Sequence, residues 1–129
     1  MRQFLAGLAA LILACGPAPR QDMTDPLTPI GESYVRLVLA VGVHDPDYVD
    51  AFYGPAEWRA AADSAKLPIA DIRTRVAALL DSLRGVKLPD TTELVRLRQS
   101  YLTRQLESMA ARLDMLEGTR LPFDASARL

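Results

Sequence analysis

The sequence predicts an all-α fold, an antiparallel array of about four helices that follows a signal peptide and a Pro-rich tether. Apolar residues recur at steps of three, four and seven along residues 90–118, which places them on one face of a long helix. A second apolar stripe occupies residues 69–83, and the short connection between the two favours antiparallel packing. The chain is 50% hydrophobic and 24% charged, a composition typical of a folded core.

Residues 1–15 resemble a bacterial lipoprotein signal peptide with its lipobox. Arg2 precedes an apolar run that ends at Leu13, and Ala14 then places a small residue before Cys15. The resemblance implies that Cys15 is acylated and becomes the first residue after cleavage. We therefore expect an exported protein, anchored by lipid to a membrane of the bacterial cell envelope. A cleaved signal without lipid and a buried helix with a core cysteine are the alternatives.

Residues 16–29 are rich in proline and polar residues, which predicts a tether between the anchor and a helical domain at 30–129. The first helix of that domain is apolar on nearly every side, so we expect other helices to surround it. Alternation from Val35 to Val43 also fits a strand, which the helical neighbours disfavour. Glu32 and Arg36 are spaced for an exposed ion pair on this helix.

The loop after this helix is the candidate binding site, because it gathers carboxylates and aromatic rings. Its candidate residues are His44, Asp45, Asp47, Tyr48, Asp50 and Tyr53. Turn chemistry is the alternative, with aspartates at helix ends and Tyr48, Phe52 and Tyr53 packing onto the core. The sequence Asp45-Pro46 ends the helix, so His44 lies at its C-terminus, where a favourable interaction with the helix dipole is a simpler role than metal binding.

Three more helices are expected downstream. Pro55 suits the first turn of a short helix whose Trp58 should anchor it to the core, together with Ala61, Ala62 and Ala65. Gly85 and Gly118 should end the two striped helices, and Asp90, Thr91 or Thr92 should cap the start of the longer one. Asp124 looks like the cap of a further helix, so we expect the domain to be incomplete at its C-terminus.

The sequence carries no recognisable catalytic motif. It contains no HExxH, no GxSxG, no glycine-rich phosphate loop and no cysteine pair, and it has one histidine. We therefore assign no catalytic residue, no metal ligand and no cofactor to this chain. With a net charge of −1 and no cluster of basic residues, the chain also lacks the electrostatic pattern of a nucleic-acid-binding protein.

Three segments nevertheless resemble a known group of proteins. They are Val43-His-Asp-Pro-Asp-Tyr-Val-Asp-Ala-Phe-Tyr-Gly-Pro-Ala-Glu-Trp58, Tyr101-Leu-x-x-Gln-Leu106 and Gly118-x-Arg-x-x-Phe-Asp124. They are similar to the N-terminal part of larger, mostly uncharacterised bacterial proteins, often exported, that are related to helical zinc metallopeptidases. The resemblance implies the N-terminal helical part of a hydrolase whose zinc ligands lie in a longer parent protein. The alternative is a small lipid-anchored helical module that binds a partner protein or has a structural role.

Overall fold

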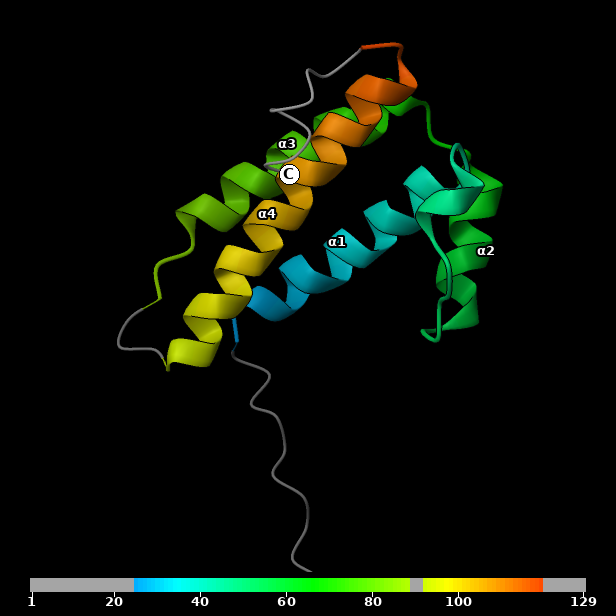
Figure 1. Cartoon of the computed structure of the whole chain (residues 1–129). Helices are drawn as coiled ribbons and strands as arrows, with labels where there is room; N and C mark the ends of the chain where they lie inside the picture. The colour runs from blue at the N-terminus through cyan, green and yellow to red at the C-terminus, as the bar shows by residue number, and fades with distance from the viewer. Residues whose placement is uncertain (1–24, 89–91, 120–129) are drawn as a thin grey trace, which may run out of the picture.

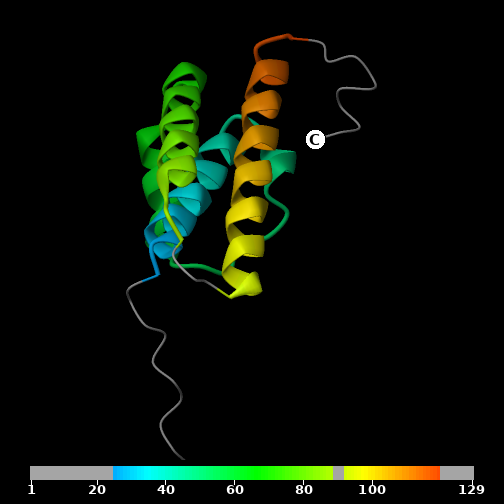
Figure 2. The same ribbon diagram turned by 90° about the vertical axis from the view of Figure 1, so that its left-hand side faces the viewer.

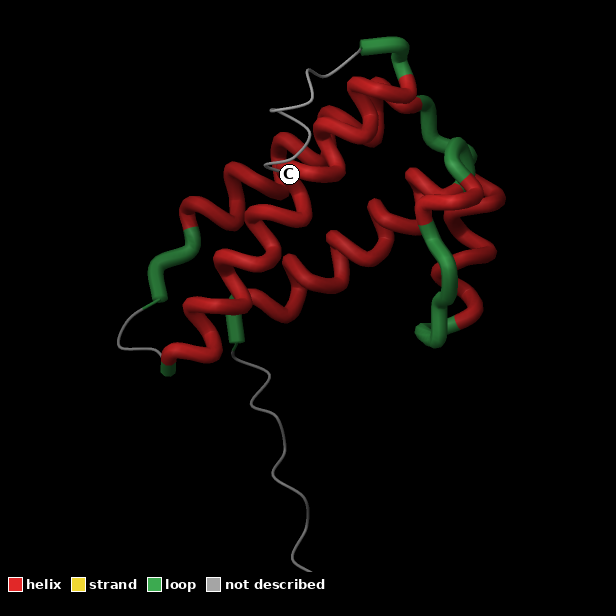
Figure 3. The backbone as a smooth tube through the Cα atoms, viewed as in Figure 1, coloured by secondary structure: helices red, strands yellow, loops and turns green. Residues whose placement is uncertain are grey.

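The structure is a computed structural model of the chain, and it describes residues 25–88 and 92–119. Within these ranges every regular element is helical, as Figure 3 shows, and the all-α prediction is confirmed. The elements are α1 (Leu27–Gly42), the 3₁₀ helix η1 (Pro46–Tyr48), α2 (Ala56–Ala65), α3 (Ile69–Gly85) and α4 (Glu93–Leu116).

Helix α1 lies at the centre of the array, because it packs against α2, α3, α4 and η1 (Figure 1). Its apolar residues are buried on more than one side, as expected from the sequence, and the segment that alternates from Val35 to Val43 is helical up to Gly42. By contrast, α2 makes close backbone contact with α1 alone among the described helices. The fold is therefore a compact group of α1, α3 and α4 with α2 attached at one side.

Helices α3 and α4 run antiparallel and lie side by side (Figure 2), as the short connection between them predicts. Their predicted stripes supply the greater part of one buried cluster, to which α1 contributes the rest. This core consists of Leu27, Ile30, Leu37, Ala40, Val41, Ile72, Val76, Leu80, Leu83, Leu102, Leu106, Met109 and Leu113. Burying one such leucine or isoleucine stabilises the fold by about 1.5–3 kcal/mol, so the cluster is the main source of stability.

Helix α1 begins three residues earlier than the sequence indicated. Leu27 is fully buried in the core, so residues 27–29 form the first turn of the helix and not the end of a tether. The backbone N–H of Leu27 donates to the carboxylate of Asp25 at 2.9 Å, and that carboxylate also pairs with Arg98 of α4. Pro29 fits the first turn because the N–H that proline lacks has no partner inside the helix there.

The sequence predicted the C-terminal end of α4 correctly and one candidate for its N-terminal cap incorrectly. Gly118 follows α4 with a φ of 94°, the left-handed conformation expected of a terminating glycine. Thr92 precedes α4 but makes no capping hydrogen bond through its side chain, so the cap predicted there is wrong for Thr92. Asp90 and Thr91 lie outside the described residues. At the end of α2, Lys66 adopts a φ of 42°.

Candidate functional site

The loop that joins α1 to α2 uses its first two polar residues to hold the fold together. His44 follows α1 directly, and its backbone N–H donates to the carbonyl oxygen of Val41 at 2.9 Å, so its predicted position at the helix C-terminus is confirmed. Its side-chain Nε2 lies 2.6 Å from the carbonyl oxygen of Leu67, to which a protonated Nε2 donates. This contact ties the end of α1 to the connection between α2 and α3.

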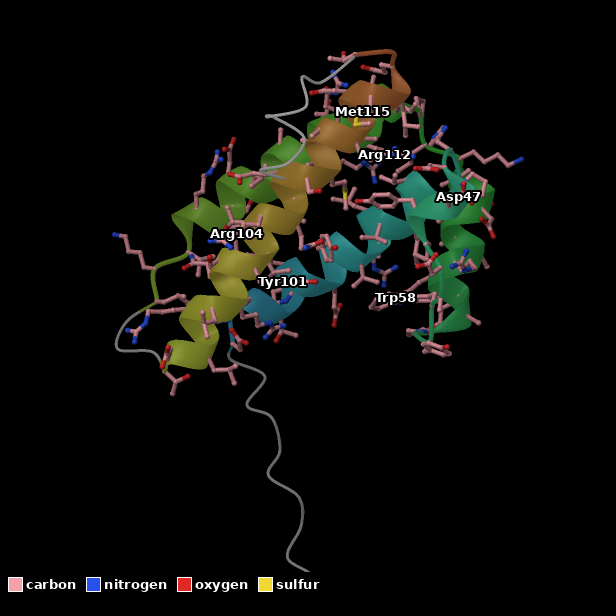
Figure 4. All side chains as sticks on the ribbon, viewed as in Figure 1. Asp47, Trp58, Tyr101, Arg104, Arg112 and Met115 are labelled. Carbon is pink, nitrogen blue, oxygen red and sulfur yellow. The ribbon has the colours of Figure 1, made fainter. Side chains whose placement is uncertain are left out.

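Asp45 is the only buried charged residue of the described part of the chain, with 7% of its surface exposed. Its Oδ2 accepts from Nε of Arg112 at 2.7 Å and lies 2.6 Å from Nη2 of the same guanidinium. Figure 4 shows Arg112 on α4, close to the end of α1. Because a buried carboxylate needs a partner of opposite charge, this pair fixes the loop to α4 and leaves Asp45 little capacity for a ligand.

Tyr48 and Tyr34 lie on the same side of the core as this ion pair. Burial is the main cause of the raised pKa of Tyr48; the charge of Arg112 lowers that pKa and the charge of Asp45 raises it. Burial also raises the pKa of Tyr34 to about 12, with smaller contributions from Tyr48 and Tyr101. The Tyr34 hydroxyl donates to Oε1 of Gln105 at 3.2 Å. Burial thus favours the neutral form of both phenols, Tyr34 between α1 and α4 and Tyr48 on η1.

The other predicted loop residues do not form a site with His44, Asp45 and Tyr48. Asp47 and Asp50 are exposed, and Tyr53 is 97% exposed. The packing expected of Tyr48 is confirmed, whereas that expected of Tyr53 is wrong, because Tyr53 lies in an exposed stretch that continues through Gly54 and Pro55. Within residues 25–88 and 92–119, no three His, Cys, Asp or Glu side chains are placed to hold a metal ion. Cys15 lies outside the described residues.

A second surface stands out on α4. Leu94, Leu97 and Tyr101 lie on one helical face, with 75%, 58% and 58% of their surface exposed. Met115 lies on the same face, closer to the C-terminus of α4. Arg104 lies beside them and forms no ion pair with a described residue. Figure 4 shows Tyr101, Arg104 and Met115 along the helix. We call Leu94, Leu97, Tyr101, Arg104 and Met115 the outer α4 face.

A third feature is a groove of about 490 Å³ between α1, α2 and α3, which we call the α2 groove. Its lining is mostly apolar. The lining residues are Ser33, Arg36, Leu37, Ala40, Trp58, Ala61, Ala62, Ala65, Leu67, Arg75, Ala78, Leu79 and Ser82.

Trp58 belongs to this groove and not to the core. Its ring is half-buried and projects from α2 towards α1 (Figure 4), where the guanidinium of Arg36 lies 4.1 Å from the ring centroid. The anchoring role predicted for Trp58 is therefore replaced by a cation–π contact at the groove, and Ala61 and Ala65 are exposed. The predicted ion pair of Arg36 with Glu32 is not formed.

Neither the outer α4 face nor the α2 groove was predicted, although the sequence contains a signal for the outer α4 face. Leu94, Leu97 and Tyr101 recur at steps of three and four, a second stripe on a helix whose first stripe is already complete. The groove has no such signal. Arg36, Trp58 and Arg75 lie on three different helices and meet only through the packing of α1.

Comparison of the chain with protein-family models, with curated proteins and with solved structures finds no significant match. The resemblance to proteins related to zinc metallopeptidases therefore stays a prediction. None of the described helices combines the length and the apolar character needed to cross a membrane.

Proposed function

We propose that this chain is a lipid-anchored helical module of the bacterial cell envelope that docks to an apolar helical surface through the outer α4 face. It supplies no catalytic residue itself. Following the resemblance, the docked surface belongs to the catalytic part of a metallopeptidase-like hydrolase, and the chain is the N-terminal helical part of that enzyme. Any zinc is then held by the docked part, and the acylated Cys15 holds the assembly at the membrane.

The exposure of Leu94, Leu97 and Tyr101 carries this proposal. Scattered exposed leucines are ordinary on protein surfaces, but three large apolar side chains on adjacent turns of one helix form a continuous stripe. Such a stripe is the usual way in which one helix recognises an apolar groove or another helix. A carboxylate on the docked surface would complement Arg104 beside the stripe.

A separate partner protein is the second candidate for the docked surface, and the same stripe favours it. The gene sequence beyond the codon for Leu129 distinguishes the two. A continued reading frame with histidines at zinc-ligand spacing supports the enzyme, whereas a stop codon leaves the partner protein.

Dye binding and light scattering test the docking face itself. Every buried residue of the described structure lies between Leu27 and Leu113, so residues 16–129 retain the whole core. We expect this soluble form to bind a hydrophobic dye or to self-associate. Leu97→Asp should reduce both signals by placing a charge in the stripe. Ala77→Asp is the matched control, because Ala77 is an exposed residue on α3.

A monodisperse wild-type chain that binds no dye would contradict the proposal. Equal effects of Leu97→Asp and Ala77→Asp would contradict the choice of face. Metal analysis of the same sample provides a further check, because one tightly held metal ion per chain would show that the chemistry is not confined to the docked part.

A further inference from the structure

We propose that the α2 groove binds a single-chain amphiphile with an anionic head, with its alkyl chain along the alanines of α2 and α3 and its head at Arg36 and Arg75. Long-chain carboxylates and lysophospholipids share this chemistry. The site lies on other helices than the outer α4 face, so it is independent of the proposed function.

The groove exists because most side chains that α2 contributes to it are small. Helix α2 packs on α1 and makes no close backbone contact with α3. Ala61, Ala62 and Ala65 line the α2 wall, and their methyl groups leave the gap to α3 unfilled. The α3 wall consists of Arg75, Ala78, Leu79 and Ser82. A volume of about 490 Å³ falls within the range of about 300–1,000 Å³ that is typical of small-molecule sites.

The charges at the groove select an anion. Arg36 from α1 and Arg75 from α3 both line it, neither pairs with a carboxylate among the described residues, and neither Asp nor Glu belongs to the lining. The hydroxyls of Ser33 and Ser82 already donate to carbonyl oxygens of their own helices, each at 2.9 Å. The charged donors of the lining are therefore the two guanidinium groups, which bind carboxylate or phosphate oxygens with charge-assisted hydrogen bonds.

The lining of the groove suits one alkyl chain with an anionic head, because apolar side chains lie beside two arginines. An alkyl chain can lie along a narrow floor of alanine methyl groups, and the stacked Arg36 and Trp58 then cover one side of it.

Trp58 makes the site directly observable, because it is the only tryptophan of the chain. We would titrate residues 16–129 with palmitate and with lysophosphatidic acid and follow the emission of Trp58. Hexadecanol tests whether binding needs a charged head group, and inorganic phosphate tests whether binding needs an alkyl chain. We expect both anionic amphiphiles to shift the emission, hexadecanol to bind about tenfold more weakly or worse, and phosphate to give no response. The stronger of the two anionic ligands indicates which head group the site prefers.

Two variants locate the site. Arg75→Gln should weaken palmitate binding about tenfold, whereas Arg96→Gln, at an exposed arginine of α4, should not change it. Ala78→Leu should fill the groove and abolish the response, while its neighbour Ala77→Leu, which is exposed outside the lining, should leave it intact. All four changes are at exposed helix positions, and circular dichroism would verify that the fold is retained.

Three outcomes would overturn the proposal. The first is an unchanged Trp58 emission with both anionic amphiphiles, and the second is equal affinity for hexadecanol and palmitate. The third is a wild-type dimer that Ala78→Leu, but not Ala77→Leu, converts to a monomer in the absence of amphiphile. That result would assign the groove to a second copy of the chain.

Discussion

The carboxylate of Asp45, in the loop after α1, is closed off from solvent against the guanidinium of Arg112 on α4, with 2.7 Å between Oδ2 and Nε. The two residues are far apart in the sequence, and the pair locks the end of α1 to the last turns of α4. In the sequence, Asp45 had been one of six candidates for a binding loop. Its burial with a fixed partner makes it a determinant of stability.

Arg112→Met should therefore destabilise the fold, because it leaves the Asp45 carboxylate buried without a partner. Arg112 is itself partly exposed, so we expect the free energy of unfolding to fall by about 1–3 kcal/mol, less than for a fully buried pair. Urea denaturation measures the loss. Arg84→Met removes the exposed ion pairs of Arg84 with Asp81 and Glu107 and should cost less than about 1 kcal/mol. Equal losses in the two variants would show that the Asp45 pair has no special weight.

Leu106→Asp should unfold the chain or weaken it by about 3 kcal/mol or more, because it places an unpaired charge in the core between α3 and α4. Leu106 is fully buried. Leu97→Asp, on the same helix but in the outer α4 face, should leave the melting temperature within a few degrees of wild type. Circular dichroism melts compare the two, and an unchanged midpoint for Leu106→Asp would rule out the observed packing.

Tyr34 should make the fold sensitive to alkali. Its pKa is raised from 10.0 to about 12, so the folded chain holds this proton more tightly than the unfolded chain does. The stabilisation is complete below pH 10 and is lost as the pH rises through about 12, because in that interval the folded state binds more protons than the unfolded state. We expect the free energy of unfolding to fall with pH in this window.

Tyr34→Phe should flatten that alkaline fall, at a cost of about 1 kcal/mol at neutral pH for the lost hydrogen bond to Gln105. Tyr53→Phe is the control, since Tyr53 is exposed and should leave the pH profile unchanged. Denaturant melts across the alkaline range provide the measurement. The same slope in Tyr34→Phe as in wild type would assign the sensitivity to other groups.

Cys15→Ser should abolish incorporation of labelled lipid and release the protein from the membrane fraction, because Cys15 is the only cysteine of the chain. Labelling of wild type and variant in a bacterial host, followed by fractionation, tests both effects. Wild-type protein without label would refute acylation, and retention of the unlabelled variant at the membrane would point to another anchor.

The sequence predicted the helices well because their stripes depend only on local spacing. Leu102, Leu106, Met109 and Leu113 are buried, as the period of α4 required. Boundaries were less accurate where a side chain far away in the sequence decides them. The start of α1 at Leu27 depends on Asp25, which Arg98 of α4 holds in place.

The candidate sites could be predicted only in part, because each depends on long-range packing. Nothing near Asp45 in the sequence indicates that Arg112 pairs with it, and nothing near Arg36 indicates that it stacks on Trp58 and not beside Glu32. Amphipathic patterns indicate which face of a helix is buried but not which helix covers it. The longest helix is α4, whereas the helix that packs against the most elements is α1.

The attachment of α2 to α1 alone has a consequence for the order in which the protein opens. A helix with a single neighbour and no buried residue can detach in a sub-global unfolding event while the α1, α3 and α4 core remains intact. The amides of α2 should therefore exchange with solvent deuterium faster than those of α3. Such an opening would admit a long alkyl chain from the side, and a bound amphiphile would slow exchange in α2 by holding the helix closed.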